Sequence, residues 1–426
     1  MKNFNKLYSL PESNFRADIK NNYKFKILDS DENGREIWAF KLHDVFFKDK
    51  SYYPDVTFIS LIDNENYEPI DEEIMSLKKV KATVFKGSTT PNKIENIYRK
   101  PLFYFIYNTD NYYHFVYDTL PYIYTFLKLK KEFPDLKLLV SPSNFQKKDL
   151  FLFVYDFLSI LNIKKSDLVF LDSSVLYSEL YVSNSLTHSG KSEVAPREEI
   201  FDLFNEIKFT AMSLCKKVDV IKKIYVSRRT WLHNDVDNIG TNYTQRRVLQ
   251  NEDELVSFLS AKGYVEIFSE SLSTIERISL FAKAEKIIGT SGGGLVNTIF
   301  SGKQSSLLVI NSPLFDNINR RFRFSYKNTN VSFFDFTKHL DEGRFKRYMR
   351  VEVPSMNIVG EIIDIIKDQL LISYTATKLA GWNSELKLSE ILVNKSLCIS
   401  LDGGLNSPWE MDMTKFHETF CKFDHE

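Results

Sequence analysis

Cysteine is scarce in this sequence, with three residues, Cys215, Cys398 and Cys421, among 426. They lie far apart and form no CxxC pair, so the sequence indicates neither a disulfide framework nor a zinc site. We therefore expect the protein to work in a reducing compartment.

Long apolar runs and an excess of one charge are also missing. No stretch approaches the roughly 18 uninterrupted apolar residues of a membrane-spanning helix, and residues 1–10 lack the apolar core of a signal peptide. The 56 basic residues balance the 56 acidic ones, which gives no indication of nucleic acid as a partner. We expect a soluble, cytoplasmic protein of two or three domains; the oligomeric state stays open.

Metal motifs are weak. Asp29-Ser30-Asp31 and Asp235-Val236-Asp237 resemble the DxD motif of some sugar-nucleotide enzymes, but the first lies in a predicted turn and the second in a polar loop. We expect no metal at either. The glycine-rich segment described below also matches neither GxGxxG nor the P-loop pattern.

The first half of the chain changes character near residue 100. Short alternating runs separated by turn signals predict a β-rich entry section, with strands near 23–28, 36–42, 56–62 and 80–85. After that, the pattern predicts helical structure over 111–131, a strand at 136–140, a helix at 149–163, strands at 168–172 and 180–184, and a long helix beginning at Pro196.

From residue 223 strands and helices alternate regularly. The predicted strands are 223–227, 264–268, 286–289 and 307–310, and the predicted helices are 252–261, 274–284 and 295–300. This alternation is typical of a parallel sheet covered on both faces. Ser273 and Glu276 form a capping box that supports the second of these helices. Further on, we expect an amphipathic helix over 357–371 and an irregular appendage from Ser373.

The segment from Ile287 to Asn297 carries three consecutive glycines, Gly292, Gly293 and Gly294, between a buried strand and a helix start. Glycines there let backbone N–H groups approach an anion at a helix N-terminus. A tight turn with nothing bound explains the same residues equally well. Ligands of open parallel sheets gather at the carboxyl ends of the strands, where this loop is expected to lie.

Two arginine pairs are expected near the same edge. Arg228 and Arg229 follow one strand, and Arg246 and Arg247 precede a helix, with a polar loop at 230–245 that we interpret as a mobile lid. Arginine forks bind phosphate through two parallel hydrogen bonds, so the pairs would suit a diphosphate. A surface charge cluster is the alternative interpretation.

His114 and Asp118 lie four residues apart in an aromatic segment, so they share one face of a helix. A carboxylate placed there can take a proton from an acceptor hydroxyl. Alternatively, Asp118 caps a helix whose first turn contains Pro121, and His114 is a satisfied core histidine.

Taken in order, these segments resemble glycosyltransferase family 61 over about residues 100–310. The residues that carry the resemblance are Asn111-Tyr112-Tyr113-His114, Asp118, Leu120-Pro121, Tyr225-Val226-Ser227-Arg228-Arg229, Arg246-Arg247-Val248-Leu249, Asn251-Glu252, Gly263, Leu280-Phe281, Ala284, Ile287-Ile288-Gly289, Gly292, Gly294-Leu295 and Asn297. The resemblance implies an α/β fold of GT-B architecture, in which two Rossmann-like lobes face a cleft and the terminal helix crosses back to the first lobe. The lobes would be residues 1–215 on the acceptor side and 216–356 for the nucleotide sugar, with the crossing helix and a tail in 357–426.

The resemblance also implies inverting, metal-independent transfer from a nucleotide sugar, usually uridine-linked, to a glycan or protein-linked hydroxyl, with no cofactor. Asp118 becomes the expected base, with His114 orienting it or the acceptor. The expected donor and diphosphate residues are Arg228, Arg229, Arg246, Arg247, Thr290, Ser291, Gly292, Gly293, Gly294 and Asn297, and the expected acceptor-side residues are Asn111 and Tyr113.

One position departs from the family. Its usual histidine at the start of the glycine loop is replaced by Ser291, and a serine can donate a hydrogen bond to phosphate but cannot become cationic. This departure keeps open a non-catalytic carbohydrate or nucleotide-sugar binding protein. An unrelated nucleotide-dependent α/β enzyme, such as a methyltransferase, is a third interpretation.

Overall fold

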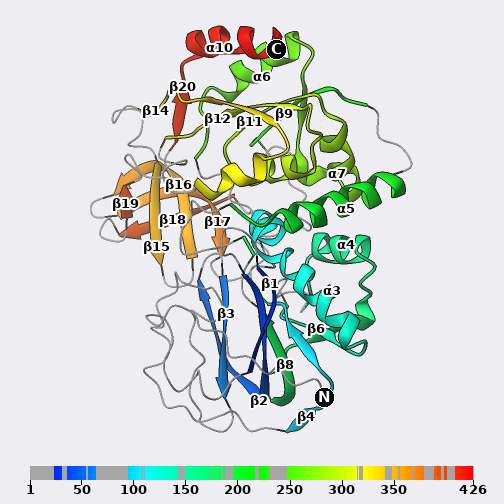
Figure 1. Cartoon of the computed structure of the whole chain (residues 1–426). Helices are drawn as coiled ribbons and strands as arrows, with labels where there is room; N and C mark the ends of the chain where they lie inside the picture. The colour runs from blue at the N-terminus through cyan, green and yellow to red at the C-terminus, as the bar shows by residue number, and fades with distance from the viewer. Residues whose placement is uncertain are drawn as a thin grey trace.

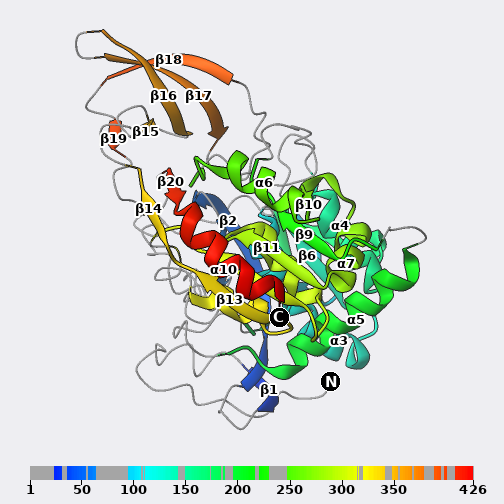
Figure 2. The ribbon, with the colours of Figure 1, turned by 90° about the horizontal axis from the view of Figure 1, so that it is seen from above.

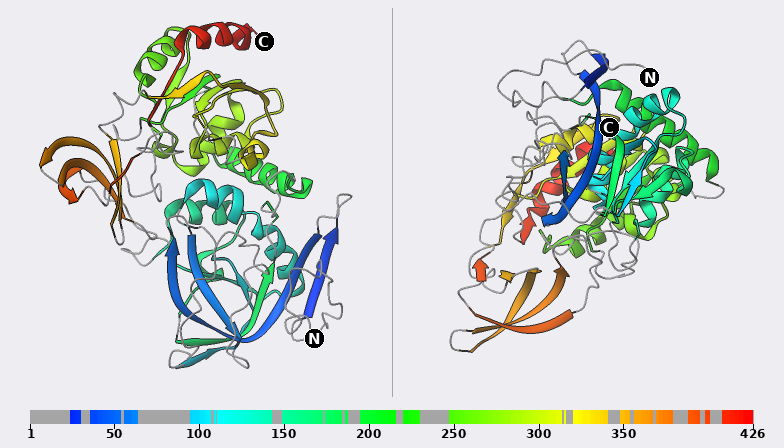
Figure 3. Two further views of the ribbon diagram at one scale, coloured as in Figure 1. Left: turned by 90° about the vertical axis from the view of Figure 1, so that its left-hand side faces the viewer. Right: turned by 90° about the horizontal axis from the view of Figure 1, so that it is seen from below.

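The computed structural model describes three units, two α/β units and an antiparallel sheet set to one side of them (Figures 1 and 3). The residues that it describes are 24–30, 36–53, 56–63, 95–106, 109, 111–142, 149–172, 174–183, 186–187, 195–215, 220–229, 247–313, 315, 320–340, 348–353, 356–366, 369–378, 388–394, 398–400 and 408–425. The predicted strand at 80–85 and the loop 230–246 lie outside them.

The first unit is built on a mixed sheet in the order β1-β2-β8-β5-β6-β7. Its parallel strands are β5 Leu102–Tyr104, β6 Lys137–Val140, β7 Leu168–Phe170 and β8 Val175–Ser183, with β4 Asn96–Tyr98 beside β8. The antiparallel strands are β1 Lys24–Ser30, β2 Glu36–Tyr53 and β3 Val56–Asp63. The predicted β-rich entry section is therefore part of the same sheet.

Helical segments follow β5 where the sequence predicted them. They are α2 Tyr112–His114, the π-helical turn η3 Phe115–Thr119, α3 Tyr122–Glu132, α4 Leu152–Ile160 and α5 Glu198–Leu214. In η3 the backbone N–H of Leu120 donates to the carbonyl of Phe115 at 2.7 Å, five residues back. Such wide turns inside α-helices are frequent at functional sites.

The second unit confirms the predicted parallel sheet. Its strands lie in the order β10 Val265–Ile267, β9 Lys223–Val226, β11 Lys286–Thr290, β12 Ser306–Ile310 and β13 Asn330–Phe334. Helices α6 Glu252–Ala261 and α7 Thr274–Lys283 also match, and the Ser273–Glu276 capping box is present. The predicted helix after the glycines is the 3₁₀ segment η7 Gly293–Phe300.

Alternating strand residues bury both faces of this sheet. On one face Ile224 and Ile287 join a large apolar cluster that also includes residues of α4, α5 and α7. On the other face Tyr225 and Ile288 pack in a second cluster with α6 and the C-terminal helix α10 Met413–His425. The first cluster also contains Phe103 and Leu138 of the first unit's sheet, so the two α/β units share a continuous core.

Two predictions for the C-terminal region are wrong. Residues 357–371 are not a helix: β16 Met356–Ile366 and β17 Gln369–Lys378 pair antiparallel within a sheet in the order β18-β17-β16-β15-β19. Most apolar residues of this stretch are isoleucine and valine, which lose side-chain freedom in a helix and favour strands. The expected irregular appendage from Ser373 contains two more strands of this sheet, β18 Leu388–Asn394 and β19 Cys398–Ser400, and β15 Tyr348–Val353 precedes β16 (Figure 2).

The terminal helix α10 packs on the second unit. Asp424 of α10 accepts hydrogen bonds from Lys223 Nζ at 2.9 Å and from Tyr264 Oη at 2.9 Å, both in the second unit. Phe416 and Phe420 bury the apolar face of α10 against the second sheet.

Among the described residues, no helix combines the length and the apolar character needed to cross a membrane. Cys215 and Cys421 are free thiols.

Candidate functional site

The three glycines sit at the carboxyl end of β11, in the middle of the second sheet. The N–H of Ser291 donates to the carbonyl of Ile310 at 2.9 Å, which holds the loop against the end of β12. Ser291 Oγ accepts from the backbone N–H of Ser312 at 3.2 Å. A hydroxyl that accepts a hydrogen bond in this way can still donate its own proton.

Close approach of neighbouring atoms explains Gly292 and Gly294. A Cβ on Gly292 would lie 2.5 Å from Nη1 of Arg228 and 3.8 Å from Nη2 of Arg247, and one on Gly294 would lie 2.9 Å from Cγ1 of Val226. A Cβ on Gly293 would lie 3.6 Å from Cβ of Tyr113, which belongs to the first unit. The loop therefore brings both arginines and the first unit to one place.

Arg228 is oriented by Glu252, the first residue of α6. Oε1 of this buried carboxylate accepts from the backbone N–H of Arg228 at 2.9 Å, from Tyr225 Oη at 2.8 Å and from Ser227 Oγ at 3.1 Å. Burial lowers the pKa of Arg228 from its usual value, and the nearby charge of Glu252 opposes this shift. Burial likewise raises the pKa of Glu252, against the hydrogen bonds it accepts.

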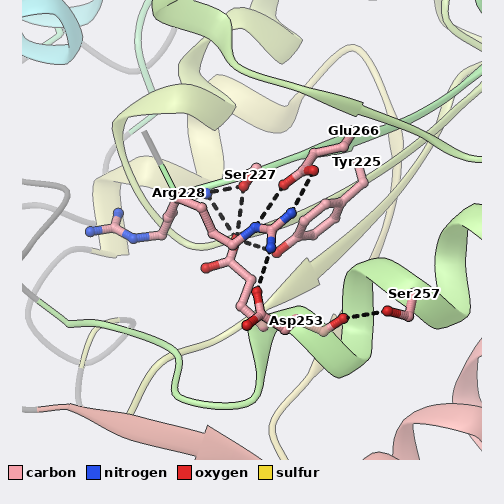
Figure 4. Close-up of polar contacts among 8 residues, drawn as sticks. Tyr225, Ser227, Arg228, Asp253, Ser257 and Glu266 are labelled. Atoms are coloured by element: carbon pink, nitrogen blue, oxygen red, sulfur yellow. Dashed lines mark hydrogen bonds and ion pairs between the residues drawn. The ribbon is translucent and has the colours of Figure 1, made fainter. Parts of the chain in front are cut away.

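Arg229 does not lie with Arg228. Its Nε and Nη2 donate to the two carboxylate oxygens of Glu266 at 3.0 and 2.7 Å, and its Nη1 pairs with Asp253. Figure 4 shows the Arg228 side chain leaving the turn on the side opposite Glu266 and Asp253. The structure thus assigns the two neighbouring arginines different surroundings, and only Arg228 lies at the glycines.

Arg247 also reaches the loop, near Gly292. Its backbone has φ 59°, a left-handed conformation that is costly for a residue with a side chain. Its guanidinium lies 4.4 Å above the ring of Phe315. Arg246 and the rest of the expected lid lie outside the described residues, as do Asp235 and Asp237.

His114 and Asp118 form a pair, as their spacing predicts. His114 Nδ1 lies 2.6 Å from Asp118 Oδ2, with the Asp118 side chain fully buried and 21% of the His114 side chain exposed. Asn111 is the N-cap of α2, and its side chain accepts from the N–H of His114 at 3.2 Å. Asp118 does not occupy the first turn of α3 as a cap, because Pro121 holds that N-cap position.

Aromatic contacts join the two units beside this pair. Tyr112 Oη donates to Oδ1 of Asn297 at 2.6 Å, and Arg277 lies 4.4 Å above the Tyr112 ring. Tyr113 stacks on Phe322, with ring centroids 3.7 Å apart. The segment around His114 is thereby fixed relative to the glycine loop.

Three buried hydroxyls near the loop make no hydrogen bond to any residue that the structure describes: Thr290 Oγ1, Ser269 Oγ and Ser312 Oγ. Ser269 Oγ lies 3.6 Å from where a Gly294 Cβ would be, and Ser312 donates its N–H to Ser291. Buried polar atoms are nearly always paired, so hydroxyls without a protein partner indicate a polar ligand or water.

Sequence reasoning missed Glu252, Arg277, Phe315 and Phe322 as parts of this site. The sequence indicates Glu252 only as the start of a helix. A carboxylate directly after the N-cap is common there, so its role at the site could not be recognised. Arg277 is the only basic residue in the middle of the apolar helix α7, which is a signal of a buried partner. The part of the chain that the structure describes holds no group of three or more His, Cys, Asp or Glu side chains suited to a metal.

A family model described as Glycosyltransferase 61 matches residues 112–308, which include His114, Asp118, Arg228, Arg247 and the glycine loop. No curated protein matches the chain.

Proposed function

We propose that this chain, whose residues 112–308 match the Glycosyltransferase 61 family, is a glycosyltransferase that transfers a sugar from a UDP-linked donor with inversion. The acceptor in this proposal is a hydroxyl of a glycan or of a protein-linked sugar. The proposal includes a GT-B arrangement of the two α/β units and no requirement for a metal.

The observation that carries the proposal is the convergence at Gly292. Arg228 and Arg247 come from opposite ends of the 230–246 loop, and both guanidinium groups lie near this glycine. A diphosphate leaving group gains negative charge as the bond to the sugar breaks, and preorganised cations stabilise that charge without a metal. The buried hydroxyls of Thr290 and Ser312 add donors at the same edge of the sheet.

The acceptor side of the proposal rests on His114 and Asp118. Because the Asp118 side chain is fully buried and that of His114 is partly exposed, an acceptor hydroxyl reaches the imidazole more readily than the carboxylate. We assign the proton-accepting role to His114 Nε2. Asp118 then accepts a hydrogen bond from the Nδ1–H of His114, which fixes the tautomer and stabilises the imidazolium once Nε2 is protonated.

In this scheme the acceptor oxygen attacks the anomeric carbon as its proton moves to His114. The bond between the anomeric carbon and the diphosphate oxygen breaks, and UDP leaves with its charge held by Arg228 and Arg247. Attack from the face opposite the leaving group inverts the anomeric configuration. Asp118 acting directly as the base, the expectation from sequence, would require the acceptor to enter a buried position.

The test is a transfer and donor-hydrolysis screen with a panel of nucleotide sugars, with and without EDTA. We expect turnover of a UDP-sugar that EDTA does not reduce. His114→Ala should abolish transfer while UDP binding, measured by calorimetry, persists. Asp118→Asn should lower kcat by about 10²–10⁴-fold, the range of a general base that loses its support.

Other outcomes of these experiments would contradict parts of the proposal. Full transfer by Asp118→Asn removes that residue from the mechanism, and full transfer by His114→Ala with loss in Asp118→Asn restores Asp118 as the direct base. Tight UDP binding without turnover of any donor indicates a binding protein, whereas stabilisation by S-adenosylmethionine and not by UDP contradicts the donor class.

A further inference from the structure

Arg247 is held by a strand far from it in sequence. Trp409 begins β20 Trp409–Met411, and its indole N–H donates to the backbone carbonyl of Arg247 at 2.8 Å, across 162 residues. This bond reaches the one described donor-site arginine whose backbone is left-handed, with φ 59°. A carbonyl fixed in this way restricts the peptide that follows Arg247 and so opposes return to an ordinary conformation.

Further hydrogen bonds connect β20 to the residues that follow Arg247. The N–H of Trp409 donates to the carbonyl of Val248 at 3.0 Å, and the N–H of Gln250 donates to the carbonyl of Trp409 at 2.9 Å. Asn251 completes the contact, because its side chain donates to the carbonyl of Met411 at 2.9 Å and accepts from the N–H of Met411 at 3.2 Å. Residues 247–251 are thus paired with the C-terminal strand along their whole length.

Strand β20 is held in place by its own pairing and packing. β20 pairs antiparallel with β14 Thr337–His339, and the Trp409 side chain is 1% exposed in the same cluster as Phe416 of α10. Helix α10 follows β20 directly and is tied to the second sheet through Asp424. A rigid support of this kind can maintain a strained backbone that a free loop would relax.

We propose that β20 is part of the donor site and that Trp409 is a positioning residue, which holds Arg247 in the left-handed conformation that brings its guanidinium to Gly292. The inference rests on the proposed function for the role of Arg247 toward the diphosphate. It extends the site beyond the segment 112–308 that the family model matches, to residues 409–411.

The test replaces the indole donor and keeps an aromatic ring. Trp409→Phe should raise KM for the UDP-sugar and the dissociation constant of UDP by about fivefold or more, the effect of one lost hydrogen bond, with kcat nearly unchanged. The decisive measurement is a double-mutant cycle with Arg247→Ala. In the Arg247→Ala background, Trp409→Phe should have no further effect on the dissociation constant of UDP. If Trp409→Phe acted through a general loss of structure, it would weaken UDP binding in that background as well.

Phe416→Leu is the matched control, since it also shrinks a buried aromatic residue of this cluster but removes none of the hydrogen bonds between β20 and residues 247–251. It should lower the melting temperature and leave KM unchanged. If Trp409→Phe does not fold, Asn251→Ser is the second variant. It removes the two hydrogen bonds between Asn251 and Met411 and should give a smaller increase in KM for the UDP-sugar.

The outcomes separate the two proposals. If the wild-type protein neither binds UDP nor turns over any donor, the proposed function fails. If the wild type binds and turns over a UDP-sugar, but Trp409→Phe binds UDP normally or weakens it equally in the Arg247→Ala background, the positioning role of Trp409 is excluded and the proposed function stands.

Discussion

Tyr112 of the first unit donates a 2.6 Å hydrogen bond to Oδ1 of Asn297 in the second. The amide nitrogen of Asn297 in turn donates to the carbonyl of Gly294 at 2.9 Å. Through these two bonds the segment that carries His114 is connected to the last glycine of the loop. The Tyr112 phenol therefore contributes, beside the Tyr113–Phe322 stack, to the relative position of the proposed catalytic and donor groups.

Removing that phenol should loosen the site. Burial raises the pKa of Tyr112, so the hydroxyl stays protonated and remains a donor through the physiological range. Tyr112→Phe should lower the free energy of unfolding by about 1 kcal/mol, the cost of one buried hydrogen bond. We also expect a lower kcat, measured with saturating donor and acceptor. Tyr155→Phe, which removes a phenol bonded within the first unit, is the control and should leave kcat unchanged.

Space at Gly292 should matter more than its backbone freedom. Its φ of 164° is extended and open to any residue, but a Cβ would lie 2.5 Å from Arg228 Nη1. Gly292→Ala should displace the guanidinium and raise KM for the donor by about tenfold, since a charged hydrogen bond contributes about 1.5–3 kcal/mol. At Gly302 an added Cβ meets its nearest atoms at 3.7 and 3.9 Å, so Gly302→Ala should leave KM as it is. Equal KM values for the two variants would remove Gly292 from the donor site.

Substitution of Arg228 and of Arg229 should affect different properties, UDP affinity in the first case and thermal stability in the second. Arg228 lies at the glycines, so Arg228→Ala should weaken UDP binding about tenfold or more in calorimetry, with little change in melting temperature. Arg229 is bonded to Glu266 and Asp253, so Arg229→Ala should lower the melting temperature and leave UDP affinity unchanged. The reverse pattern would show that the assignment of the two side chains is wrong.

Helix α10 should contribute stability that depends on pH through Asp424. Burial alone would raise the pKa of this carboxyl, but its hydrogen bonds from Lys223 and Tyr264 and the charges of Lys223 and Lys286 lower it overall. A lowered pKa in the folded state means that the stabilisation is complete above the unfolded value of about 3.9 and is lost as pH falls through the folded value.

Asp424→Asn should therefore destabilise the protein by about 1 kcal/mol near pH 7, measured by urea unfolding. The difference from wild type should shrink below about pH 4. Glu418→Gln, on the same helix and paired with Lys415 at its exposed surface, is the control and should show little effect at either pH. A difference that does not change with pH would contradict a role for the Asp424 charge.

Local patterns of the sequence determined much of this protein. The strand and helix alternation from 223 to 310 specified the second sheet, because apolar periodicity and caps such as Ser273 act over a few residues. The same logic placed His114 beside Asp118, since residues four apart share a helix face. It also placed Arg228 and the glycine loop together, because parallel strands end at one edge of a sheet.

Other features depended on contacts between distant residues. The apolar residues between 357 and 371 recur at helical spacing, and pairing with the neighbouring strands makes β16 and β17 extended. Which arginine faces the loop is decided by the partners Glu252 and Glu266, each more than twenty residues away. The exposure that distinguishes His114 from Asp118 exists only once both units have packed around them. The hydrogen bond from the Trp409 indole to the Arg247 carbonyl joins residues 162 positions apart, and neither segment contains a local pattern that predicts it.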